Sequence, residues 1–112
     1  MLGKAYCEIL GTVTKDPESK TTSGGNSLCT FSVAVNERRG ENETVSYFDV
    51  EAWNKVGEIV QNNCKKGDNL SLRCKMKQDR FEQEVGGETV KRSKVRLSLM
   101  DINFCGGGKK DE

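Results

Sequence analysis

Apolar and polar residues alternate along much of this chain, which is the pattern of β-strands that bury one face. The alternation is clearest in residues 28–36, where Cys29, Phe31, Val33 and Val35 share one face. Strand composition or the same two-residue period recurs in four further stretches: residues 4–14, 45–53, 69–81 and 89–100. The pattern therefore predicts five β-strands.

Residues 54–64 have a different period. Their apolar residues lie three, four and eight positions after Val56, which places them along one stripe of a short helix. Asn54 is a candidate N-cap, and Lys65-Lys66-Gly67 supplies cations and a stop residue at the other end. We expect one helix between the third and fourth strands.

Breaks in the pattern mark the connections. Pro17 has no N–H to donate, so it ends the first strand. Gly11 indicates a bulge or a close backbone approach within that strand, and a bulge or strand end is expected near Asp101. Loops or turns are predicted at residues 19–27, 37–44 and 86–87.

The predicted element order is three strands, a helix and two strands. This order is typical of the OB-fold, a mainly all-β fold that forms a five-stranded Greek-key barrel. Strand order alone leaves an open five-stranded sheet as the alternative. A length of 112 residues suits one domain. We place that domain at residues 1–105 and a short flexible tail at residues 106–112, which are rich in glycine and charge.

Composition narrows the chemistry. The chain has no histidine, which argues against histidine-based catalysis and most zinc enzymes. Its carboxylates show no paired spacing and its glycines fit no phosphate-binding loop, so we expect no enzyme, no cofactor and no metal. Five cysteines without a Cys-x-x-Cys motif, and no signal peptide or membrane-length apolar run, predict free thiols in a cytoplasmic protein.

Charge distribution is more informative than the net charge of +1. Most charges between residues 70 and 100 fall on outward positions of a predicted hairpin, and cations outnumber anions there. A basic surface attracts nucleic-acid phosphates, although a solvated hairpin with protected edges is the alternative. Arg38-Arg39 is either a phosphate clamp or a solvated pair. The cations are Arg73, Lys75, Lys77, Arg80, Lys91, Arg92, Lys94 and Arg96, against Asp79, Glu82, Glu84 and Glu88.

Three aromatic residues, Tyr47, Trp53 and Phe81, lie on outward positions of their strands. Exposed rings beside cations suit single-stranded nucleic acid, because unpaired bases stack on the rings. The alternative is a second packing layer, for example a subunit interface. Asp49 and Glu51 lie between Tyr47 and Trp53 and would repel phosphate.

These motifs together resemble the bacterial-type single-stranded-DNA-binding proteins over residues 4–105. Each segment is weak alone, but their order and spacing are specific. The segments that carry the resemblance are GTVTKDPE (11–18), CTFSVAVN (29–36), YFDVEAWNKVGEIV (47–60), CKKGD (64–68), DRF (79–81) and INF (102–104).

The resemblance implies an OB-fold that assembles as a homotetramer, with a homodimer as the alternative. It implies binding of single-stranded DNA without sequence preference, in replication, recombination and repair. By motif position, the family's base-stacking aromatics match Tyr47, Trp53 and Phe81. The expected phosphate contacts are Arg38, Arg39, Arg73, Lys75, Lys77, Arg80, Lys94 and Arg96.

The chain departs from the family pattern in three respects. The three rings are Tyr, Trp and Phe, so not every tryptophan of the family is retained. Glu51 is acidic where the family has an apolar or small residue, and the family's long tail with an acidic tip has no counterpart here. Recruitment of replication proteins through such a tail is therefore not carried over. We expect a nucleoid-associated protein without membrane contact. The alternatives are a tailless OB-fold accessory subunit of a replication complex and a single-stranded RNA binder.

Overall fold

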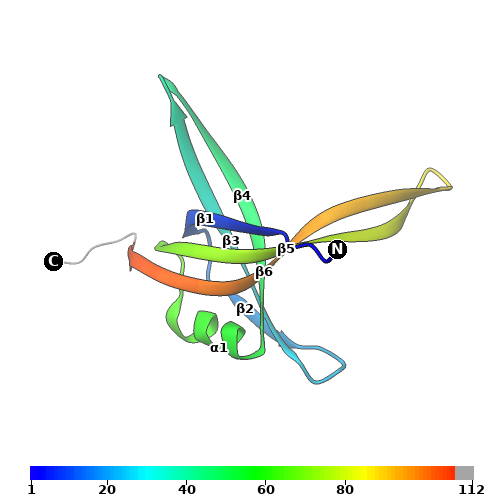
Figure 1. Cartoon of the computed structure of the whole chain (residues 1–112), viewed down its shortest axis with the longest axis horizontal. Helices are drawn as coiled ribbons and strands as arrows, with labels where there is room; N and C mark the ends of the chain where they lie inside the picture. Colours follow the sequence, from blue (N-terminus) through cyan, green and yellow to red (C-terminus); the bar gives the residue numbers. More distant parts are fainter. Residues whose placement is uncertain (108–112) are drawn as a thin grey trace.

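The computed structural model describes residues 1–107, which form six strands and one helix (Figure 1). Residues 108–112 of the predicted tail lie outside the described residues. In chain order the elements are β1 (Tyr6–Val13), β2 (Glu18–Thr21), β3 (Ser27–Arg39), β4 (Asn42–Trp53), α1 (Asn54–Asn63), β5 (Asp68–Val85) and β6 (Glu88–Gly107). The last strand thus continues two residues beyond the expected domain end at residue 105.

The strands form one closed sheet. Their order is β1-β5-β6-β4-β3-β2, and β1 also pairs with β3 at Thr12 and Val13, which closes the barrel. Neighbouring strands are antiparallel except β4 and β6, which run parallel and pair only at Val50–Leu97 and Glu51–Ser98. The predicted OB-fold is confirmed, with its helix between the third and fourth long strands, and the open sheet is excluded.

Hairpins extend out of the barrel, and two of them are formed by long strands (Figure 1). One joins β3 to β4. The other joins β5 to β6, and its strands pair with each other from Asp68 to Val85. Pairing of β5 with β1 ends at Lys75 and Met76, and pairing of β6 with β4 begins at Leu97. Residues 77–96 therefore form a two-stranded segment without other strands beside it, which we call the arm.

Two of the predicted loops contain strand residues. Residues 19–27 include part of β2, whose four residues are all exposed and pair with the beginning of β3. In residues 37–44, β3 and β4 stay paired as far as Arg39 and Asn42 and turn at Gly40. The residues of β2 and residues 37–44 are all exposed, so no hydrophobic period reveals these strand segments.

Three local predictions are confirmed. A Cβ atom on Gly11 would lie 2.9 Å from the Ala34 carbonyl oxygen, so the strands do approach closely there. The β5–β6 register shifts next to Asp101, which leaves Met100 as a bulge. Gly86 and Gly87 both have positive φ and form the hairpin turn.

The core lies inside the barrel and under α1, and most of its strand residues occupy the inward positions that alternation predicts. Leu28 has the opposite phase to Cys29 but is buried as well, with 7% exposed. Val33, Val50 and Val60 are fully buried, and Phe31 is 3% exposed. The remaining buried core residues are Ile9, Val13, Leu28, Cys29, Ala52, Cys64, Leu70, Leu72, Cys74, Leu97 and Leu99.

The start of α1 differs from the prediction. Trp53 occupies the N-cap position and makes no side-chain cap hydrogen bond, so Asn54 is not the cap. Asn54 instead adopts a positive φ of 53°, and its Oδ1 accepts a hydrogen bond from the Ser27 backbone N–H at 3.1 Å. This bond ties the helix start to the beginning of β3.

All five cysteines are free, and Cys29, Cys64 and Cys74 are buried. Burial raises the pKa of the Cys64 thiol to about 11 and that of Cys74 to about 12. These thiols act as small core residues and are protonated at neutral pH.

Gly57→Ala should lower the free energy of unfolding by about 1–3 kcal/mol, because an added Cβ would lie 2.5 Å from the Ala52 carbonyl oxygen. Helix propensity alone favours alanine by about 1 kcal/mol, so the sign of the change is diagnostic. Urea unfolding measures it. Gly24→Ala, whose Cβ would have its nearest neighbour at 3.9 Å, is the control and should change little. A Gly57→Ala variant as stable as the wild type would show that α1 can shift away from Ala52.

Stability should fall as the pH rises from 9 to 12. The thiols of the unfolded chain ionise near 9.0, whereas Cys64 and Cys74 keep their protons in the folded state until about 11 and about 12. The unfolded state then binds fewer protons than the folded state, so stability decreases with pH in this window. Urea midpoints at pH 8 and pH 10.5 test this. Cys74→Ala should reduce the pH dependence, and Cys105→Ala, at an exposed position, should not. Equal pH dependence in all three proteins would refute the assignment.

Candidate nucleic-acid interface

One continuous outer face runs across β3, β4, β6 and β5. On β4, Phe48, Val50 and Ala52 have the inward phase, so the residues between them point outward. Cross-strand register then aligns outward residues of all four strands into rows, such as Ser32 beside Asp49. We define the outer face by Thr30, Ser32, Tyr47, Asp49, Glu51, Trp53, Lys77, Asp79, Phe81, Arg92, Lys94, Arg96 and Ser98.

The three predicted rings are all exposed on this face. Tyr47 is 67% exposed, Trp53 36% and Phe81 43%. Tyr47 and Trp53 are six residues apart on one strand, or about 20 Å at the usual rise of a strand. Phe81 lies on the arm. The rings therefore form separate platforms along a path and not a single aromatic pocket.

The middle of the outer face holds a charged cluster. Arg96 Nη1 lies 2.5 Å from Glu51 Oε2, and Arg96 Nε lies 2.8 Å from Asp79 Oδ2. Hydrogen bonds to these two carboxylates raise the pKa of Arg96, and the bond to Asp79 has the larger effect. Asp49 accepts a hydrogen bond from the Ser32 hydroxyl. Each carboxylate in the middle of the face is thus already engaged.

The basic residues of β5 extend the face toward β1. Lys75 aligns with Ser98 on one side and Tyr6 on the other. Arg73 lies one register step further, with its guanidinium carbon 5.0 Å from the centre of the Tyr6 ring. These two predicted contacts are therefore continuous with the outer face.

Three other predicted cations lie apart from it. Arg80 has the opposite phase to Phe81, so it points to the other side of the arm. Arg38 and Arg39 lie at the tip of the β3–β4 hairpin, where Arg38 Nη2 is 4.0 Å from Glu43 Oε2. The structure thus does not bring Arg38 and Arg39 together with the three rings, whereas Arg80 lines a surface depression of about 550 Å³ with Phe81.

Residues missed by the sequence reasoning lie beside the charged cluster. Lys15 lines a shallow depression of about 280 Å³ with Thr30, Ser32 and Lys94. The alternation in residues 28–36 already placed Thr30 and Ser32 outward, but Lys15 lies in a loop where no period indicates its direction.

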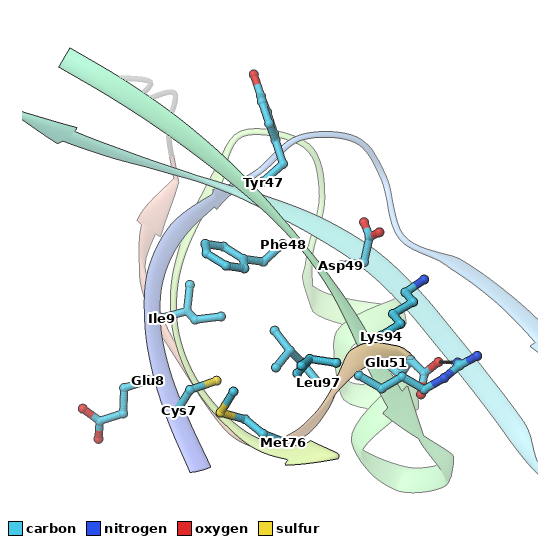
Figure 2. A pocket seen from close by; sticks show the side chains of 12 residues that line it. Cys7, Glu8, Ile9, Tyr47, Phe48, Asp49, Glu51, Met76, Lys94 and Leu97 are labelled. Atoms are coloured by element: carbon cyan, nitrogen blue, oxygen red, sulfur yellow. Dashed lines mark hydrogen bonds and ion pairs between the residues drawn. The ribbon is translucent and has the colours of Figure 1, made fainter. Parts of the chain in front are cut away.

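An apolar cavity of about 490 Å³ opens at the end of the barrel next to Tyr47. Figure 2 shows Ile9, Phe48 and Met76 pointing into it, while Tyr47 points away. Phe48 is 37% exposed although it has the core phase, because the barrel is open here. Lys94 lies at the rim, on the outer-face side (Figure 2).

Residues 1–107 contain no group of three side chains that could hold a metal ion. No helix in the same range is long and apolar enough to cross a membrane.

Comparisons with known proteins agree with this geometry. The model of the single-strand binding protein family matches residues 6–105. A single-stranded DNA-binding protein of Treponema pallidum is 38% identical over 102 residues, covering 88% of this chain and 56% of the relative. Single-stranded DNA-binding protein 1 of Synechocystis is 33% identical over 104 residues, covering 92% and 84%. The chain thus spans little more than half of the first relative.

A solved structure has the same fold. A Plasmodium falciparum SSB complex with ssDNA superimposes with a TM-score of 0.74 at 17% identity, covering 93% of this chain and 96% of that one.

Proposed function

The chain belongs to the single-strand binding protein family, and on that premise we propose that it binds and protects single-stranded DNA without sequence preference. The process served would be replication, recombination and repair. The observation that carries the proposal is the outer face, where exposed Tyr47, Trp53 and Phe81 are spaced among cations on an OB-fold barrel.

Binding follows from two kinds of contact. The rings stack on unpaired bases, and stacking tolerates every base because each has a π-face. A duplex hides its base faces, so the same surface favours single strands. Lysine and arginine contact phosphates and release counterions from the strand. On the outer face and its continuation toward β1, the cations are Arg73, Lys75, Lys77, Arg92, Lys94 and Arg96.

The carboxylates oppose binding less than their positions in the sequence indicate. Glu51 and Asp79 are paired with Arg96, and Asp49 accepts the hydrogen bond of Ser32. Their negative charge is therefore partly compensated within the protein. Binding of this kind requires no catalytic group and no cofactor, and its DNA target would place the protein at the nucleoid in the cytoplasm.

We further propose that the chain assembles as a homotetramer. Between Tyr6 and Leu10, β1 pairs with β5 on one edge only, within the part of the chain that the structure describes. An unpaired strand edge can pair with a second copy. Apolar side chains are exposed nearby, with Leu10 69% and Met100 42% exposed.

Fluorescence titration tests DNA binding directly, because Trp53 is the only tryptophan. Poly(dT) should quench its emission at low salt, and log K should fall by about 0.7 per phosphate contact for each tenfold rise in salt. Phe81→Ala should weaken binding about fivefold or more, since stacking contributes about 1–3 kcal/mol per base.

Phe104→Ala is the matched control, because Phe104 is 47% exposed but lies off the outer face. Unchanged emission at saturating poly(dT) would remove Trp53 from the interface. Equal affinity of Phe81→Ala and wild type would remove Phe81. Tighter binding of oligo(U) than of oligo(dT) would instead indicate an RNA target.

Light scattering tests the assembly. The solution mass should be four times the chain mass of 12.4 kDa, with and without oligo(dT). A mass of one or two chains would contradict the tetramer without affecting the DNA-binding proposal.

A further inference from the structure

The central cation of the outer face is already occupied in the DNA-free protein. Two nitrogens of Arg96 bond to two different carboxylates, Glu51 at 2.5 Å and Asp79 at 2.8 Å. In contrast, neither Lys77 nor Lys94 forms an ion pair among residues 1–107. Arg96 thus differs from Lys77 and Lys94 because it already forms ion pairs with carboxylates of the protein.

These three residues come from three strands that meet at one point. β4 and β6 pair only at Val50–Leu97 and Glu51–Ser98, so Arg96 is the first residue of β6 beyond this ladder. It is also the residue at which the arm begins. Asp79 belongs to the opposite strand of the arm. The guanidinium therefore connects the barrel to the base of the arm.

The ion pairs are open to exchange with an external anion. The side chains of Arg96, Glu51 and Asp79 are 45%, 20% and 41% exposed. Exposed pairs contribute little to stability, so breaking them costs little. Guanidinium groups recognise phosphate and carboxylate oxygens by the same directional N–H bonds. A DNA phosphate can therefore replace either carboxylate without a change of fold.

We propose that Glu51 and Asp79 act as an internal substitute for phosphate, competing with single-stranded DNA for Arg96 and thereby limiting its affinity. This inference rests on the proposed function. When a phosphate takes over Arg96, the released carboxylates take up cations, which offsets the counterion released by the DNA. The Arg96 contact thus adds little to the salt dependence of the wild type.

The competition has a direct test in Glu51→Gln, which keeps the shape of the side chain and removes its charge. Oligo(dT) affinity at low salt should rise at least about threefold, as expected for removing one charge a few ångströms from a phosphate. The slope of log K against log salt should become steeper by up to about 0.7, since one more contact would then release a counterion. Asp79→Asn should act in the same direction.

Glu58→Gln is the control for net charge, because Glu58 is exposed on α1 and lies off the outer face. It should change affinity much less than Glu51→Gln. The double variant Glu51→Gln with Arg96→Gln should lose the gain, since the competition acts through Arg96. Thermal melting of each variant checks that it is folded.

The outcomes separate this inference from the proposed function. If the wild type binds oligo(dT) but Glu51→Gln gains no more than Glu58→Gln, the competition is refuted and DNA binding stands. A gain that persists in the double variant also refutes it, because Arg96 would then play no part. If neither the wild type nor any variant binds, the proposed function fails and this inference fails with it.

Discussion

Closure of the barrel by β1 is the constraint on which the rest of the structure depends. β1 pairs with β5 along most of its length and with β3 at Thr12 and Val13. The close approach at Gly11 keeps these backbones together. Closure fixes which residues point inward, and the alternation of strands then assigns the remaining residues to the outside. The outer face is therefore a consequence of how the core is filled.

On that face, position matters more than net charge. The whole chain carries only +1, and outward cations are interspersed with Asp49, Glu51 and Asp79. The protein nevertheless presents a surface suited to a polyanion, because its carboxylates are engaged by neighbouring side chains while Lys77 and Lys94 are not paired within residues 1–107. The rings add attraction that does not depend on charge at all.

Features that follow from a local repeat, such as strands and the direction of their side chains, could be predicted from the sequence. Contacts between residues far apart in the chain could not. The two-residue period and strand composition located the five long strands, and the period gave the outward phase of Tyr47, Trp53 and Phe81. It could not reveal β2, whose exposed residues carry no such period. Nor could it show that Glu51 is bonded to Arg96, 45 residues away in the chain, because that contact exists only after β4 and β6 align. The expectation that Glu51 repels phosphate was therefore made without knowledge of its partner Arg96.

The arm affects the path that a flexible single strand could follow over the surface of this molecule. Residues 80–93 lie beyond the part of the arm that faces the barrel, so both sides of this ribbon meet solvent, with Phe81 on one side and Arg80 on the other. A strand leaving the barrel surface can turn around the edge of the ribbon and return along its reverse. Under the proposed function, the path open to DNA is thus longer than the footprint of the barrel itself.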